Sequence, residues 1–297
     1  GGRPEDLETL FQLIHLYITE PREDGNAYRN FRERLREVVK NRQDSPEAAF
    51  ADRVQVLLAQ NHFRARPWSL EILEEMDLEK SLAIYRDRFR DAGDFTFLFV
   101  GSFRLEQIEP LVTLYLGSLP AEGRVEHWRD TGIDPPRGLV KEEVRKGLEP
   151  KSRVAMVFSG QTAWSLERRL ELAALAEILD IRLREVVREE AGGSYDVEAD
   201  AETRRYPDEE YFVTVEFGCA PEQVETLSAY VLGEAERLGR QGPEPGDLAK
   251  VKEILRREHE KDLKENDYWL GTLQLVYSND LDPRILLDFD KRLESLS

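Results

Sequence analysis

The chain has 297 residues, of which 40% are hydrophobic and 34% charged, a composition typical of a globular protein long enough for two domains. Its 60 acidic residues outnumber its 42 lysines and arginines, and the net charge of -18 excludes nucleic acid and anionic membrane as expected partners. No apolar run reaches the roughly 18 residues that a membrane span needs, and the one cysteine, Cys219, excludes an internal disulfide and a cysteine-based zinc site.

The first part of the chain is predicted to be mostly helical. It opens Gly1-Gly2-Arg3, without Met or signal peptide, and enters a helix almost at once, which suggests a segment of a longer protein. The apolar stretch at 95–100, Phe-Thr-Phe-Leu-Phe-Val, predicts a strand that Gly101 ends. The helices are predicted at residues 5–18, 26–41, 46–60, 78–89 and 105–116.

A single strand among helices is itself informative. Its backbone N–H and C=O groups need partners that one strand cannot supply. The rest of its sheet is therefore expected outside this chain, or the strand pairs with another molecule.

Residues 121–137, which contain Gly123, Gly132 and a Pro-Pro pair, have the composition of a linker. They separate a truncated first domain, residues 1–120, from a second domain, residues 138–297. The second domain is richer in strands, predicted at residues 139–145, 154–158, 195–201 and 211–217. Its helices are predicted at residues 165–190, 221–238, 245–266 and 280–297. These elements predict the α+β class, with helices packed on one face of a mainly antiparallel or mixed sheet.

The two domains share a pattern of strand, glycine and helix. Val100-Gly101 leads into Glu106-Gln107-Ile108-Glu109, and Phe217-Gly218 leads into Glu222-Gln223-Val224-Glu225. Glu-Gln-apolar-Glu is also a common helix opening, but the match continues over a dozen positions and indicates a duplication. The first copy would then lack its opening strands.

The most distinctive local pattern is the junction between the first helix of the second domain and the strand after it. Ser165 is a good N-cap, because its hydroxyl can accept from an otherwise unpaired backbone N–H. Gly192 and Gly193 suit the left-handed conformation that closes a helix. Arg188 in the last turn and Tyr195 at the strand start are therefore expected at one edge of the domain. On local evidence alone, helix capping and packing explain both residues better than a function does.

In order along the chain, several motifs resemble the pitrilysin/insulinase family of zinc peptidases, the inverzincins. The stretch Leu183–Tyr195 is similar to the Arg…Gly…Tyr segment of that family, and His62–Pro67 to one of its turns. Further similar motifs are Tyr85–Phe89, Phe99–Phe103 and Tyr115–Pro120. The resemblance implies duplicated α+β domains of the processing-peptidase-like metallohydrolase kind, paired into two halves around a peptide-sized chamber.

In that family one half carries H-x-x-E-H and zinc, and this chain resembles the other, metal-free C-terminal half. None of the four histidines, His15, His62, His127 and His259, has the spacing of that motif. No metal ligand and no catalytic residue is therefore expected in this chain, and zinc is expected in the partner half. His259 comes nearest to a metal-binding motif, because His259-Glu260 would begin H-E-x-x-H if Leu263 were His. It is expected to be a solvated surface residue.

The resemblance implies that Arg188 and Tyr195, with Gly192 and Gly193, bind substrate and assist the transition state from across the chamber. The chain is then the inactive half of a zinc metalloendopeptidase, inactive alone, which positions peptides for a zinc half on the same polypeptide or a separate subunit. The alternative is a non-catalytic structural core subunit, or a peptide-binding assembly module of the same fold. The compartment, periplasm or cytoplasm, and the peptide substrate stay open.

Overall fold

The structure is a computed structural model that describes residues 2–191 and 197–297, except for the side chains of residues 187–191. Its contacts divide the chain into two compact units, Gly1–Lys146 and Gly147–Ser297. Helices and a three-stranded antiparallel sheet confirm the predicted α+β class.

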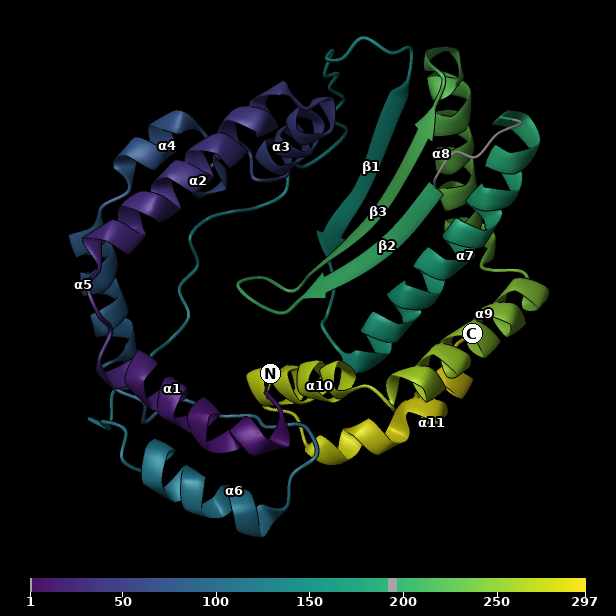
Figure 1. Ribbon diagram of the computed structural model, residues 1–297. Helices are drawn as coiled ribbons and strands as arrows, with labels where there is room; N and C mark the ends of the chain where they lie inside the picture. Colours follow the sequence, from purple (N-terminus) through teal and green to yellow (C-terminus); the bar gives the residue numbers. More distant parts are fainter. Residues whose placement is uncertain (1, 192–196) are drawn as a thin grey trace. The chain divides into compact units, whose positions relative to one another are not determined.

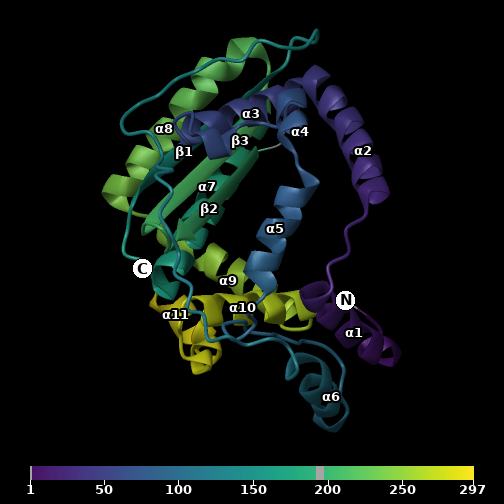
Figure 2. The same cartoon turned by 90° about the vertical axis from the view of Figure 1, so that its left-hand side faces the viewer.

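The first unit is built from helices (Figures 1 and 2). α1 and α6 lie at the same end of the unit, where Tyr115, in the turn after α6, ties them together. Its hydroxyl accepts from Gln12 at 3.1 Å, and its carbonyl oxygen lies 2.8 Å from Nδ1 of His15. The helices are α1 (Leu7–Thr19), α2 (Gly25–Asp44), α3 (Pro46–Leu58), α4 (Leu70–Glu75), α5 (Leu78–Phe89) and α6 (Leu105–Leu111).

Side-chain caps explain where four of these helices begin. The capping oxygens, which accept from backbone N–H groups of the first turn, belong to Asp24, Ser45, Ser69 and Asp77. α4, which follows Ser69, was not predicted, because only six residues separate its cap from its end and the apolar period is too short to read.

The predicted strand at 95–100 is wrong as an assignment. The segment pairs with no strand among the described residues, although its apolar side chains pack on helices. Phe99 stacks on Phe11 of α1 with ring centroids 5.0 Å apart, and Phe95 meets Phe89 of α5 edge-on at 5.7 Å. The apolar composition correctly predicts that the segment packs against other elements. It does not predict a strand, because strand pairing also needs a neighbouring strand.

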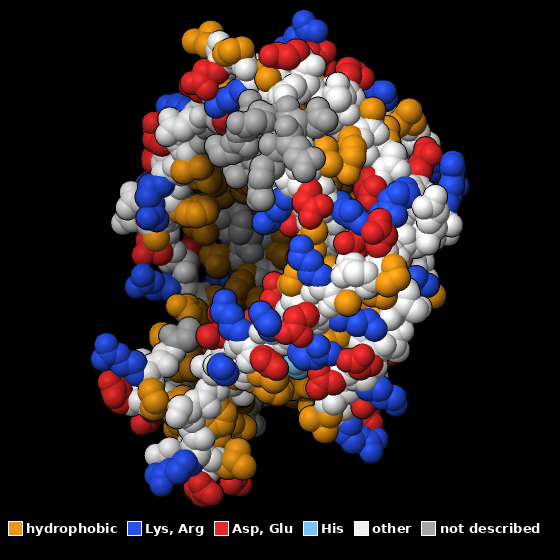
Figure 3. All heavy atoms as spheres, turned by 90° about the vertical axis from the view of Figure 1, so that its right-hand side faces the viewer, with side chains coloured by type: hydrophobic (Ala, Val, Ile, Leu, Met, Phe, Trp, Pro, Cys, Tyr) orange, Lys and Arg blue, Asp and Glu red, His pale blue; other side chains and the backbone are white. Residues whose placement is uncertain are grey.

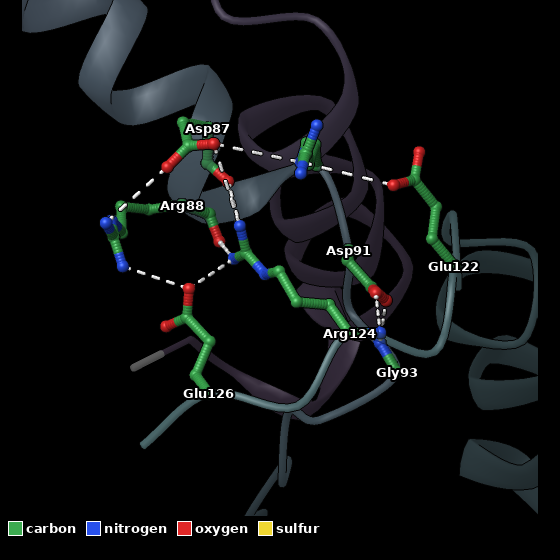
Figure 4. Close-up of polar contacts among 8 residues, drawn as sticks. Asp87, Arg88, Asp91, Gly93, Glu122, Arg124 and Glu126 are labelled. Atoms are coloured by element: carbon green, nitrogen blue, oxygen red, sulfur yellow. Dashed lines mark hydrogen bonds and ion pairs between the residues drawn. The ribbon is translucent and has the colours of Figure 1, made fainter. Parts of the chain in front are cut away.

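A polar cluster at the end of α5 fixes the chain that follows α6 (Figure 4). Asp91, which is fully buried, accepts from the backbone N–H of Arg124 at 2.6 Å and of Gly93 at 2.9 Å. The Arg124 guanidinium donates to the carbonyl oxygens of Asp87 at 2.7 Å and Arg88 at 3.1 Å. The hydrogen bond from the backbone N–H of Arg124, and next that from Gly93, lower the pKa of Asp91 below its usual value.

The strand predicted at 139–145 is also wrong. Leu139 is 83% exposed, and no residue of this stretch belongs to a strand. The contact that holds it is polar: Arg53 Nη2 donates to Glu142 Oε2 at 2.6 Å. Residues with high β-propensity form a strand only where a sheet is there to receive them.

The second unit carries the sheet, with strand order β1-β3-β2. The strands are β1 (Ser152–Gln161), β2 (Val197–Arg204) and β3 (Glu210–Cys219), which confirm the predicted strands at 154–158 and 211–217. On the central strand Val213, Val215 and Phe217 are 4%, 0% and 2% exposed, and their register partners on both neighbours are apolar. α7 (Leu166–Ala191) and α8 (Val224–Gln241) cover this face of the sheet (Figure 1).

Three further helices follow: α9 (Pro245–Asp262), α10 (Asn266–Ser278) and α11 (Phe289–Ser295). α10 was not predicted. The helix predicted at 245–266 runs past the end of α9 at Asp262, where the chain turns and Trp269 Nε1 donates to the Leu263 carbonyl at 2.9 Å. Acidic and basic side chains are interspersed over the helical side of this unit (Figure 3), as is typical of a solvated surface.

The structure supports a different register for the internal repeat. Pro4–Asp6 and Pro221–Gln223 each form a 3-10 turn that runs directly into a helix, α1 or α8. The sequences agree as well: Gly-Gly-Arg-Pro-Glu-Asp-Leu-Glu-Thr-Leu begins at Gly1, and Gly-Cys-Ala-Pro-Glu-Gln-Val-Glu-Thr-Leu begins at Gly218. In this register α2 corresponds to α9 and α3 to α10, and both α3 and α10 have 13 residues.

Candidate functional site

The candidate site lies where α7 gives way to β2. Ser165 caps α7 as predicted, since its Oγ accepts from the backbone N–H of Arg168 at 3.0 Å. Along the helix Ala176, Leu179 and Leu183 are buried, at 5%, 3% and 1% exposure, in the core shared with the sheet. The predicted apolar face is therefore the one that holds α7 on the sheet.

β2 takes up the chain at Val197, which is 6% exposed and pairs with Phe217 of the central strand. α7 runs along β2 (Figure 1). The residues that flank the connection are thus fixed on both sides, by a packed helix and by a strand ladder.

The residues predicted to act here lie outside what the structure describes. Gly192, Gly193 and Tyr195 fall in the undescribed stretch 192–196, and of Arg188 only the helical backbone is described. Their placement and their role stay predictions.

A salt bridge that the sequence did not reveal anchors α7 below the connection. Arg182 Nε and Nη2 donate to Asp247 Oδ2 at 2.9 and 2.5 Å, and Nη2 lies 3.0 Å from Glu244 Oε1. The hydrogen bond with Asp247 is the main reason that the pKa of Arg182 is raised. Because Asp247 stands in the first turn of α9, its charge also complements the dipole of that helix.

Carboxylates one turn further back on α7 lie in a drier setting. Asp180 is 8% exposed and pairs with Arg184, whose Nε is 2.8 Å from Oδ2. Burial, and next the charge of Asp180, raises the pKa of Glu177. Asp180 thus pairs with Arg184 and repels Glu177 within the unit.

His259, the one histidine of the second unit, is held by packing and a hydrogen bond. Nδ1 of His259 lies 3.0 Å from the Tyr268 hydroxyl, and its ring stacks on Phe289 with centroids 3.8 Å apart. The expectation of a solvated His259 is therefore wrong; burial lowers its pKa. Within residues 2–191 and 197–297 no group of His, Cys, Asp and Glu side chains is arranged to hold a metal ion, so this part of the chain does not fit zinc.

A model of the peptidase M16 inactive domain matches residues 75–255, more than half of the chain. The chain belongs to the peptidase M16 family. The match confirms the predicted family and its inactive, C-terminal half, and it takes in all of α7, β2 and β3. In this M16 chain, no described helix has the length and apolar character of a membrane span.

Relatives place the M16 match in longer proteins. A zinc protease PQQL-like from Arabidopsis thaliana is 28% identical over 296 residues, which cover 93% of this chain and 31% of the relative. The crystal structure of the periplasmic protease PqqL from Escherichia coli superposes with a TM-score of 0.83 at 20% identity, over 100% of this chain and 33% of that one. The ferredoxin protease FusC, solved in complex with Arabidopsis ferredoxin, gives a TM-score of 0.79 at 18% identity, over 100% and 32%. The chain thus spans about a third of the length of such relatives.

Proposed function

We propose that this chain is the inactive half of a zinc-dependent metalloendopeptidase. It helps to enclose a chamber and positions peptides for hydrolysis at zinc held by the other half. The observation that carries the proposal is the match to the M16 inactive domain across residues 75–255, which contains the connection between α7 and β2. Relatives that are named zinc proteases and are about three times as long support a separate catalytic half.

The residues of this chain act on the peptide. Arg188 offers a forked pair of donors for a backbone carbonyl or a terminal carboxylate. The Tyr195 hydroxyl donates to the carbonyl oxygen as negative charge develops on it. Gly192 and Gly193, which carry no side chain, let the peptide backbone approach closely. When bound in the other half, zinc supplies a Lewis acid for the same carbonyl.

The test uses the whole protein, with its zinc half, and a fluorogenic peptide library. Tyr195→Phe and Arg188→Ala are each expected to lower kcat/KM by about 100-fold, the usual effect of losing one such donor. Zinc content and the thermal transition should stay at the parent values, because neither residue is expected to hold metal or core.

Tyr277→Phe and Arg168→Ala serve as matched controls in the same unit. Tyr277 is 50% exposed, and the Arg168 side chain is 48% exposed and pairs with Glu171 on the surface. Parent-level cleavage by both site variants would refute the assigned roles. A zinc-loaded whole protein that cleaves no peptide in the library would favour the alternative, a structural core subunit or assembly module.

A further inference from the structure

A cavity of about 390 Å³ lies in the first unit, where α2 and α3 meet the turn that leads to α4. Its volume falls within the roughly 300–1,000 Å³ of pockets that bind ligands. Charged and aromatic side chains share its walls: Arg42 of α2, Asp52 of α3, and Phe63, Arg64, Arg66 and Trp68 of the turn.

Side-chain hydrogen bonds fix the turn on which most of these residues stand. Gln55 of α3 donates to the Ala65 carbonyl at 3.2 Å. Arg66 donates through Nε to the Phe63 carbonyl at 3.1 Å, and through its two terminal nitrogens to the Glu75 carboxylate at 2.9 and 2.8 Å. Walls that are held in place before a ligand arrives reduce the entropy lost on binding.

The guanidinium groups at the cavity differ in how far they are neutralised. Arg66 is neutralised by its carboxylate partner. Arg42 donates through Nη2 to Asp52, while its buried Nε has no acceptor among the described residues. Arg64 forms no ion pair with a described carboxylate, and its guanidinium carbon lies 5.6 Å from the centre of the Phe63 ring. Arg64 therefore leaves uncompensated positive charge at the cavity, in a chain whose net charge is -18.

Two aromatic side chains at the same cavity are open to solvent. Phe63 and Trp68 are 62% and 50% exposed. Aromatic residues and arginine are enriched in the cores of protein interfaces, where they carry much of the binding energy. Exposed rings beside an unneutralised guanidinium therefore indicate a binding surface.

We infer that this cavity binds an acidic segment of a peptide. A carboxylate of the segment accepts from Arg64 and from the remaining N–H groups of Arg42, because the flat fork of a guanidinium matches two carboxylate oxygens. An adjoining apolar side chain packs on Phe63 and Trp68. The acidic remainder of the chain repels such a segment, so the positive cavity is where it is attracted. As the class of peptide that the chain positions, the inference rests on the proposed function, but the binding itself needs no zinc.

Isothermal titration calorimetry on the whole protein tests this binding, with a chelator present so that no peptide is cleaved. The probe is acetyl-Leu-Glu-Phe-Glu-amide, and its counterpart with glutamine in place of glutamate has the same shape without the charge. We expect saturable binding of the probe, about 10-fold or more tighter than that of the counterpart, because hydrogen bonds to charged groups are the stronger ones. Equal affinities, or no binding of the probe, would overturn the inference. Tighter binding of a short oligothymidylate would also overturn it, because the cavity would then select nucleic acid.

Variants locate the binding at the cavity. Arg64→Gln is expected to lower the affinity for the probe by about 10-fold, and Trp68→Ala by several-fold, and both side chains are exposed enough that the fold should stay intact. Arg86→Gln is the matched control, because it removes the same charge from an exposed position of α5 outside the cavity. Parent-level affinity in either cavity variant, or an equal loss in the control, would overturn the inference.

The binding and the proposed peptidase role fail separately. Tyr195→Phe should leave the affinity for the probe unchanged, because the cavity belongs to the first unit. Lost binding with normal cleavage of other peptides would refute the cavity alone, whereas intact binding without any cleavage would refute the peptidase role alone.

Discussion

Arg182 of α7 and Asp247 of α9 form a two-pronged ion pair, with Nε and Nη2 of the arginine 2.9 and 2.5 Å from one carboxylate oxygen. Their side chains are only 24% and 18% exposed, so water screens the pair less than a surface contact. The pair joins the helix that leads to the candidate site to the helical layer behind it.

Arg182→Ala is expected to lower the free energy of unfolding by about 1–3 kcal/mol, because Asp247 loses its charged donor in a partly dry setting. Urea denaturation followed by circular dichroism measures this. Arg257→Ala is the control, since that side chain is 76% exposed and its bond to Glu253 lies on the surface of one helix; it should cost well under about 1 kcal/mol. Equal losses of unfolding free energy in the two variants would show that the ion pair between α7 and α9 does not stabilise the fold.

Leu183→Ala should lower the free energy of unfolding by about 2–5 kcal/mol. The side chain is 1% exposed in the core under the sheet, and its removal leaves a cavity. Leu232→Ala, on α8 at 40% exposure, is the matched control. Chemical denaturation of both proteins gives the comparison. A loss for Leu183→Ala no larger than that of the control would mean that α7 does not pack on the sheet as described.

The pKa of Asp91 lies below its usual value near 3.8, because two backbone N–H groups bind its ionised form. Its contribution to stability is therefore present above that usual value and is lost as the pH falls through the lowered pKa. We expect Asp91→Asn to reduce stability at pH 7 and to flatten the acid limb of the stability curve. Thermal melts between pH 2 and 7, with exposed Asp130 mutated as a control, test it; an unchanged acid limb in Asp91→Asn would contradict the assignment.

His259 is the one histidine of the second unit, and burial lowers its pKa from the usual value near 6.5. The unfolded chain therefore takes up a proton before the folded chain does, so stability is full above about pH 6.5 and falls as the pH drops towards the lowered pKa. His259→Phe keeps a ring against Phe289 and should remove this slope. Denaturation at pH 5.5 and 7.5 distinguishes the two proteins, and parallel slopes would disprove the origin in His259.

Local chemistry made the second unit largely predictable. Ser165 carries its own capping oxygen, α7 repeats its apolar residues over many turns, and β3 alternates clearly, so each element was found from sequence within a few residues. The candidate site was predicted from the same stretch, but its four residues lie where the structure gives no side chains. Their chemistry therefore still rests on the family.

Failures arose where the partner is distant in sequence. His259 looked solvated because its neighbours in the helix are charged, while the ring that covers it comes from Phe289, in another helix. The stretch at 139–145 pairs with none of the described strands, and it is held instead by the ion pair between Glu142 and Arg53. Arg182 and Asp247 are 65 positions apart, and nothing in either local sequence indicates the pair.

The segment Phe-Thr-Phe-Leu-Phe-Val at 95–100 also bears on how the polypeptide behaves when it is handled in pieces. Six consecutive residues with high β-propensity, no charge and no proline form the kind of sequence that stacks into cross-β fibrils once its edges are open. A fragment that exposes this hexapeptide is therefore prone to aggregate. Asp91 and Asp94 precede it in the sequence, and their negative charges oppose such stacking.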